Sequence, residues 1–418
     1  MKSAHSDVGS VGTVGGVRRW SLPSGSQRAT VLDRAFLAPL QGPLEAMRIR
    51  LKLWDGTSLY CGPASPIATV TIRDRGMLLG LLLNRHLTFG EGFSAGRLDV
   101  DGNLVGLLEA IYRTFAPRRA NGLARLSKWR RNTVDRSRHD IHHHYDLGND
   151  FYRLWLDGNM QYTCAYFPHA DMSLEAAQLA KMHHVCQKLS LRPGERVVEA
   201  GCGWGSFALF MAKEYGVTVR AYNISHEQIT EARRRAHAEG LGDRVEFVED
   251  DYRTISGCAD VFVSIGMLEH VGLAQFPVMG QVIDRALDRQ RGRGLLHFIG
   301  RDFAYPLNPW IRKRIFPGGY TPTLAQVTSQ VLEPSGFSVL DVENLRVHYA
   351  RTLAHWLTRF ESQTDRVTAR FDASFVRAWR LYLAGAQAAF TTGRMQLFQV
   401  TFGRGQWTDV PWTRGTTQ

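Results

Sequence analysis

The sequence has only five cysteines in 418 residues: Cys61, Cys164, Cys186, Cys202 and Cys258. They are scattered, form no C-x-x-C pair and are odd in number, which argues against a disulfide framework and against a zinc site. We therefore expect free thiols in a reducing cytosol. The N-terminus lacks the apolar segment of a signal peptide, and no apolar run approaches the ~20 residues of a membrane span. We expect a cytoplasmic protein whose contact with any membrane is peripheral.

Acidic residues are outnumbered by basic ones. The 51 Lys and Arg residues against 39 Asp and Glu residues give a formal net charge of +12. Such an excess favours an anionic partner, either a nucleic acid or an acidic lipid surface. The chain is long enough for two domains with full cores, and its 44% of hydrophobic residues is ordinary for a globular protein.

A glycine-rich segment is the most informative part of the sequence. Residues 197–205 form a short apolar run that ends in Glu199, followed by glycine at 201, 203 and 205 and then by a helical pattern. Glycine is needed where a ligand comes close to the backbone, because a Cβ would block the approach. The spacing E-x-G-x-G-x-G differs from the G-x-G-x-x-G of dinucleotide sites. It favours S-adenosylmethionine (SAM).

Further strands are predicted at 217–222, 245–248, 261–265 and 294–298, and Ser225 starts a helix with an S-x-x-Q capping box. Strands that alternate with helices predict an α/β fold with a doubly wound parallel sheet. Ligands of such sheets bind beyond the carboxyl ends of the strands. The residues expected to line this cleft are Glu199, Asn223, Asp251, Tyr252, Glu269 and His297.

The rest of the chain divides by composition. Residues 1–28 are rich in Gly, Ser and Val and are expected to be a disordered tail, and residues 406–418 are expected to be a second tail. Residues 30–116 are expected to form a small α+β domain. A basic linker is expected at 117–143, either as a solvated connector or as a patch that docks on anionic headgroups.

Three patterns support the small N-terminal domain. Apolar residues alternate with basic ones over 47–53, which predicts a strand with one wet face, and 54–57 supply a hairpin turn. The leucine-rich stretch 77–83 predicts a buried helix, and the apolar residues of 104–115 fall on one helical face. A histidine cluster follows the linker at 139–144. It favours an ordered loop at a helix start over a metal site, because no Cys or carboxylate lies beside it at ligand spacing.

Several separate motifs, in order, resemble the cyclopropane-fatty-acyl-phospholipid synthase family of SAM-dependent methyltransferases, which is related to the mycolic acid cyclopropane synthases. The motifs are HYDLGNDFY at 144–152, YTCAYF at 162–167, the glycine turn, GMLEHVG at 266–272, PWI at 309–311, IFP at 315–317 and QLFQV at 396–400. The resemblance covers residues 85 to 405. It implies a class I SAM-dependent methyltransferase domain at 144–405 and an N-terminal domain similar to a lipid-carrier fold.

The resemblance implies a reaction. The sulfonium methyl of SAM adds to a cis double bond of a phospholipid acyl chain, and the carbocation loses a proton as a cyclopropane ring closes. The site must align the reactants, surround the cation with negative or π-rich groups and exclude water. The family's base resembles a bound bicarbonate. Its holders map to the backbone at Cys164 and Ile299 and to the side chains of Glu269, His297 and Tyr349.

The same resemblance implies the cofactor site. Tyr162 and Thr163 contact the methionine end of SAM, Asp251 accepts from the adenine amino group, and Tyr252 stacks on the ring. The remaining expected contacts, near the methionine and the ribose, are Gly201, Gly203, Asn223, Ile224 and Gln228.

Other interpretations stay open for single residues. Glu269 could instead cap the following helix, and Cys164 could be a covalent nucleophile. His297 could be a hydrogen-bonded histidine of the core. We favour catalysis for Glu269 and a positional role for Cys164, since no base partner for the thiol is evident.

Three rival functions are weaker. A nucleic-acid methyltransferase is suggested by the charge and by Asn308-Pro309-Trp310, yet that motif belongs directly after the fourth strand, and no nucleic-acid module is visible. The second rival function is the same methyl transfer with a methylene- or methyl-branched chain as its product. The third is a non-enzymatic lipid-binding protein. The expected partners are an anionic phospholipid surface and a second copy of the chain in a homodimer, and not nucleic acid. The sequence leaves double-bond position, headgroup preference and oligomeric state undetermined.

Overall fold

The computed structural model describes residues 28–59, 65–115, 147–405 and 407. The two predicted tails, the basic linker and the histidine cluster lie outside these residues, apart from Arg28 and Trp407. No helix in the described ranges is long and apolar enough to cross a bilayer.

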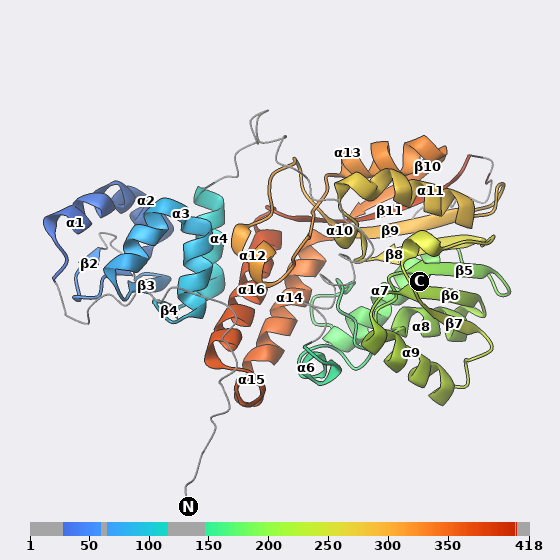
Figure 1. Cartoon of the computed structure of the whole chain (residues 1–418), viewed down its shortest axis with the longest axis horizontal. Helices are drawn as coiled ribbons and strands as arrows, with labels where there is room; N and C mark the ends of the chain where they lie inside the picture. Colours follow the sequence, from blue (N-terminus) through green and yellow to red (C-terminus); the bar gives the residue numbers. More distant parts are fainter. Residues whose placement is uncertain (1–27, 60–64, 116–146, 406, 408–418) are drawn as a thin grey trace, which may run out of the picture.

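The N-terminal part is a four-stranded sheet covered by helices, at the left of Figure 1. The strand order is β2-β1-β3-β4, with β1 parallel to β3 and the other two pairings antiparallel. The elements are α1 (Val31–Leu37), α2 (Gln41–Met47), β1 (Ile49–Lys52), β2 (Ser58–Leu59), β3 (Ala68–Ile72), α3 (Arg75–Ser94), β4 (Leu98–Gly102) and α4 (Leu104–Thr114).

The predicted one-sided strand is confirmed at β1, where buried and exposed residues alternate before a turn into β2. The prediction of a buried helix at 77–83 is wrong in part. Met77 and Leu78 are buried, but Leu79, Leu82 and Leu83 are exposed. A run of leucines does not by itself say which face of a helix has a partner.

The larger part is built on a seven-stranded sheet of order β10-β11-β9-β8-β5-β6-β7. The strands are β5 (Arg196–Ala200), β6 (Thr218–Asn223), β7 (Val245–Glu249), β8 (Val261–Ile265), β9 (Arg293–Gly300), β10 (Phe337–Asn344) and β11 (Gln396–Arg404). The predicted doubly wound α/β sheet is confirmed for β5 to β9, which pair in parallel. β11 runs antiparallel to both β9 and β10, so the sheet is mostly, not wholly, parallel.

Helices cover both faces of this sheet (Figure 1). One apolar core lies between the sheet and α7, α8 and α9, and a second lies between the sheet and α11. The helices around the sheet are α6 (Asn149–Arg153), α7 (Leu174–Lys188), α8 (Ser206–Tyr215), α9 (His226–Ala238), α10 (Leu268–Val271), α11 (Phe276–Ala286) and α13 (Leu324–Val327).

A separate group of helices joins the two parts. They are α12 (Pro309–Arg314), α14 (Arg346–Glu361), α15 (Thr364–Arg370) and α16 (Ala373–Thr391). In Figure 1, α14 and α16 stand between the N-terminal sheet and the large sheet, and α16 packs against α3, α4 and α14. One continuous hydrophobic cluster therefore extends from the N-terminal part into the helical layer.

Candidate active site

A small pocket of about 110 Å³ lies at the carboxyl ends of the central strands. The turn between β5 and α8 forms its floor, with positive φ at Gly201, Gly203 and Gly205. A Cβ on Gly205 would lie 2.5 Å from Cζ of Phe247, so only glycine fits there. A Cβ on Gly203 would meet nothing within 4 Å and would project into open space. The turn therefore offers bare backbone to a ligand, as the sequence pattern predicted.

Most of the predicted cofactor residues meet at this pocket. Its lining includes Tyr162, Thr163, Gly201, Gly203, Asn223 and Gln228. The Asn223 amide donates to Oε1 of Gln228 over 2.8 Å and to the carbonyl of Gly203 over 3.2 Å. These bonds tie the end of β6 to the glycine turn and to α9.

Three predicted cofactor residues are not brought into this pocket. Ile224, Asp251 and Tyr252 do not line it. The Asp251 carboxylate is held by Arg253, with Nε to Oδ1 at 2.6 Å and Nη2 to Oδ2 at 2.8 Å, and Tyr252 belongs to the apolar core between the sheet and α11. The contacts of Asp251 and Tyr252 with adenine stay a prediction, and so does the contact of Ile224 with SAM.

Two buried ionisable residues were not among the predicted cofactor contacts, although Glu199 was expected to line the cleft. Glu199, at the end of β5, lines the pocket, and its Oε2 has no partner among the described residues. Burial raises the pKa of Glu199 to about 8. Lys181 of α7 lies fully buried behind the pocket and donates to Oε1 of Gln161 over 2.5 Å and to Oγ1 of Thr163 over 3.0 Å. The prediction that Glu199 lines the cleft is confirmed, whereas nothing in the sequence marks Lys181.

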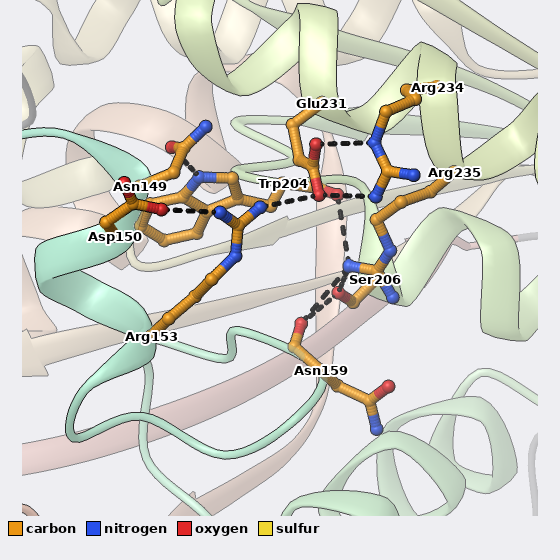
Figure 2. A network of polar contacts seen from close by, with 9 residues as sticks. All are labelled: Asn149, Asp150, Arg153, Asn159, Trp204, Ser206, Glu231, Arg234 and Arg235. Carbon is orange, nitrogen blue, oxygen red and sulfur yellow. Dashed lines mark hydrogen bonds and ion pairs between the residues drawn. The ribbon is translucent and has the colours of Figure 1, made fainter.

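A polar network ties residues 149–159, which precede Tyr162 and Thr163 in the chain, to the glycine turn and to α9 (Figure 2). Trp204 of the turn donates from Nε1 to Asn149 of α6 over 2.7 Å. Arg235 of α9 donates to Oγ of Ser206 over 2.5 Å and to the carbonyl of Asn159 over 3.3 Å. Arg153 of α6 pairs with Glu231 of α9 over 3.0 Å. Residues 149–159 are therefore anchored to both the turn and α9.

A second, much larger cavity of about 530 Å³ adjoins this pocket. Its walls come from α3, α4, α12, α14 and α16 and from the segment after β9, and most of the lining is apolar or aromatic. The helix α12 closes tightly on α3, because a Cβ on Gly90 would lie 2.2 Å from the ring of Trp310. The cavity is thus shared between the N-terminal part and the sheet-based part.

The two cavities meet. Tyr162, Thr163, Gly266 and His270 line both of them. Burial lowers the pKa of His270 to about 4, so this imidazole is neutral at neutral pH. The Tyr162 hydroxyl lies 2.8 Å from the Tyr382 hydroxyl of α16. A group bound on the glycine turn therefore faces directly into the apolar cavity.

Glu269 is the carboxylate at this junction. It lines the large cavity, and its Oε1 accepts from the backbone N–H of Ile299 over 2.6 Å. Oε2 is buried without a partner among the described residues, and burial raises the pKa of Glu269 to about 7. The alternative of a helix cap is not supported, because no side chain caps α10.

Aromatic and cationic groups complete the cavity wall. Tyr349 of α14 lies in it, with its ring centroid 4.6 Å from that of Phe390. Arg301, buried at the end of β9, stacks its guanidinium 4.0 Å from the ring centroid of Tyr305. The cavity thus has aromatic rings beside the junction.

The remaining two predicted catalytic residues do not line either cavity. His297 lies two residues before Ile299 on β9, and its Nδ1 is 3.1 Å from Nε2 of Gln399. Burial, together with the charges of nearby lysines, lowers the pKa of His297 to about 3. Its Nε2 has no partner in the described part of the chain. Of the two residues of β9 that were assigned to the bicarbonate site, Ile299 lines the large cavity and His297 does not.

Cys164 lies behind the wall. Its thiol donates to the carbonyl of Ala165 over 3.1 Å, and burial raises its pKa far above the ordinary value. A thiol that stays protonated is a poor nucleophile, which agrees with a positional role. Asn308, which belonged to a faint nucleic-acid motif, instead caps α12 by accepting from the N–H of Trp310.

The comparisons with known proteins agree with this geometry. The family described as mycolic acid cyclopropane synthetase matches residues 132–400, and a domain of unknown function matches residues 40–117. The chain belongs to the mycolic acid cyclopropane synthetase family. It is a SAM-dependent methyltransferase. The nucleic-acid and non-enzymatic interpretations are thereby disfavoured.

Two curated relatives are informative. A probable fatty acid methyltransferase of Pseudomonas putida is 36% identical over 91% of this chain and 99% of its own length. The cyclopropane-fatty-acyl-phospholipid synthase of Escherichia coli K12 is 41% identical over 63% of this chain and 67% of its own length.

Solved structures give the same family. The cyclopropane synthase MmaA2 of Mycobacterium tuberculosis superposes with a TM-score of 0.61 at 30% identity, over 64% of this chain and 98% of that one. The mycolic acid cyclopropane synthase CmaA1, solved with S-adenosylhomocysteine and CTAB, gives a TM-score of 0.61 at 28% identity, over the same shares of the two chains.

Proposed function

We propose that this enzyme transfers the SAM methyl group to a cis double bond of an acyl chain in a membrane phospholipid and forms a cyclopropane ring. The observation that carries the proposal is the junction of the two cavities at Tyr162, Thr163, Gly266 and His270. A volume of about 530 Å³ suits a long flexible ligand, and its apolar walls suit an alkyl chain. The similar structure of CmaA1 was solved with CTAB, an amphiphile with a long alkyl chain.

The chain's own residues supply three of the requirements of this reaction. The glycine turn, together with Tyr162 and Thr163, holds the methyl donor. This binding aligns the sulfonium with the alkene and lowers the entropic cost of bringing the two reactants together. The rings of Tyr162, Tyr349 and Phe390 stand beside the junction, where π-electrons stabilise a developing carbocation. The apolar walls keep out water, which would otherwise trap the cation as an alcohol.

The residues fit both small molecules that the reaction needs. For SAM, the open space above Gly203 and the unpartnered Oε2 of Glu199 suit a ligand that carries an ammonium group. For bicarbonate, Oε2 of Glu269 is a buried polar atom of the large cavity without a partner among the described residues, whereas His297 lines neither cavity. With a pKa raised to about 7, Glu269 can carry a proton and donate it to an anion instead of repelling it. When bound, bicarbonate would supply the base that accepts the proton of ring closure.

A second product has a specific observation in its favour. The Pseudomonas putida relative, similar over 91% of this chain, is named a fatty acid methyltransferase and not a cyclopropane synthase. The same cation gives a methylene-branched chain when the proton leaves without ring closure, and a methyl branch forms only when a separate reductase then reduces that double bond.

The membrane is proposed as the source of substrate. The net charge of +12 favours an anionic phospholipid surface, at which the protein would be peripheral. A homodimer stays a prediction.

The test is mass spectrometry of lipids after incubation of the protein with SAM and unsaturated phospholipid vesicles. We expect a SAM-dependent gain of one CH₂ and loss of the double bond. A gain of one CH₂ with a double bond retained would establish the branched alternative. Unchanged lipid, with SAM still bound, would overturn the proposed acceptor.

A further inference from the structure

The helix α3 is folded back on itself. Asn84, in its middle, has φ −147° and ψ 72°, which is not helical. Oγ1 of Thr88 donates to the carbonyl of Gly80 over 2.9 Å, and a Cβ on Gly92 would lie 2.3 Å from the Met77 sulfur. In a straight helix these pairs would be about 12 Å and about 22 Å apart along the axis. The two arms of α3 therefore form a hairpin, whose tip is residues 82–86.

Apolar side chains gather at and near this tip. Leu83 is 89% exposed, Leu82 is 46% exposed and Leu79, on the first arm, is 43% exposed. Single exposed leucines are ordinary, but neighbouring ones on a projecting turn mark a surface that meets an apolar partner.

The second arm of the hairpin runs from the tip into the large cavity. His86, Phe89 and Gly90 line that cavity, and Gly90 lies under Trp310 of α12. The tip is thus continuous with the wall of the proposed acyl-chain site, and only a few residues separate the exposed leucines from it.

Arginines lie on the tip and along the neighbouring cavity wall. Arg85, on the tip, places its guanidinium 5.9 Å from the ring centroid of Phe115, which is itself exposed at the end of α4. Arg394 donates to the carbonyls of Tyr112 and Phe115 over 3.1 and 2.6 Å. Both Arg394 and the exposed Arg312 line the cavity. Guanidinium groups beside an apolar tip complement a phospholipid bilayer, whose headgroups are anionic and whose acyl layer is apolar.

We propose that the tip of α3, residues 82–86, docks on an anionic phospholipid bilayer. Leu82 and Leu83 enter the acyl layer, while Arg85, Arg312 and Arg394 contact headgroup phosphates. Docking places the cavity opening against the bilayer, so that an acyl chain passes between the two without crossing water. This inference rests on the proposed function for the identity of the chain that enters.

The test is binding of the full-length protein to vesicles of unsaturated phosphatidylglycerol and phosphatidylcholine, measured by sedimentation. Leu82→Glu and Leu83→Glu each put a charge on the tip without opening a core. We expect each to weaken binding at least ~10-fold. Leu179→Glu is the matched control, because Leu179 is 44% exposed against 46% for Leu82 and lies on α7, which does not line the cavity. It should bind as the unmodified protein does.

A second measurement separates docking from catalysis. With the same phospholipid dispersed in non-ionic detergent, the tip variants should keep the turnover of the unmodified protein, whereas on vesicles their apparent KM should rise. Equal vesicle binding by tip variants and control would overturn the proposal. So would a change from dimer to monomer in light scattering at unchanged vesicle binding, which would assign the leucines to a second copy of the chain. Failure of the unmodified protein to methylate either lipid form would refute the proposed function, while sedimentation would still decide the docking.

Discussion

The two cavities of the active site are built in different ways. The donor pocket has a floor of nearly consecutive residues, 199–207, and the rest of its lining comes from Asn223 and Gln228 and from the segments 160–163 and 265–270. The acceptor cavity draws on helices from both ends of the chain, from His86 of α3 to Leu397 of β11. The first is small and partly polar, and the second is large and mainly apolar. The floor of the donor site is therefore specified locally, whereas the acceptor site is specified by how the N-terminal part and the helical layer pack together.

The largest expected loss of activity comes from a substitution beside the junction, where the methyl donor and the acyl chain must meet. Glu269→Gln should lower turnover at least ~100-fold, because the amide cannot share a proton with an anion as the carboxyl does. SAM affinity, measured by calorimetry, should not change, since Glu269 lines only the large cavity. The control is Glu239→Gln on the exposed end of α9. Full activity of Glu269→Gln would remove this residue from the mechanism.

The donor side alone should respond to a methyl group on the glycine turn. Gly203→Ala places a Cβ in the open space of the pocket and should weaken SAM binding ~10-fold, because bound ligand and Cβ compete for that space. Gly240→Ala is a matched control, since φ is +54° at Gly203 and +68° at Gly240, and neither Cβ meets an atom within 4 Å. Both variants should lose similar stability from backbone strain, about 1–2 kcal/mol. An equal loss of SAM affinity in the two would refute the close approach.

The acceptor side alone should respond to filling of the large cavity. A Cβ on Gly385 of α16 would have Tyr112 Oη at 3.7 Å as its nearest neighbour, so Gly385→Ala should be tolerated. Gly385→Leu should shorten the space and lower kcat/KM for long acyl chains ~10-fold, with a smaller effect on short chains and none on SAM affinity. The measurement is a chain-length series of phospholipids in detergent. A uniform loss over all lengths would show that Gly385 does not border the acyl chain.

The smallest expected effect is on pH dependence. Burial raises the pKa of Glu269 from 4.5 to about 7, so below that pH the carboxyl is neutral and can donate to an anion. Above it, the carboxylate repels the anion. At fixed bicarbonate concentration, activation by bicarbonate should therefore fall several-fold as pH rises from 6 to 8. Glu269→Gln should show no such fall. A rising profile in the unmodified protein would mean that the charged form is the active one.

The sequence predicted the donor pocket better than the acceptor cavity. The glycine turn and the parallel strands were predicted because those features are local and periodic. The residues assigned to the cofactor came from the family resemblance, and six of those nine line the donor pocket. The antiparallel pairing of β10 and β11 was not predicted, and neither was the role of Lys181, which depends on its contacts with Gln161 and Thr163 in another segment. The leucines of α3 were expected to be buried, because a leucine run does not show that the helix folds back at Asn84.

The most direct test of the whole account uses SAM with a fully deuterated methyl group and an unsaturated phospholipid. If the methyl passes from the donor pocket into the acceptor cavity and a proton leaves it as a ring closes, the lipid gains one CD₂ unit and loses its double bond. Retention of all three deuterium atoms, or label found only outside the acyl chain, would contradict the account.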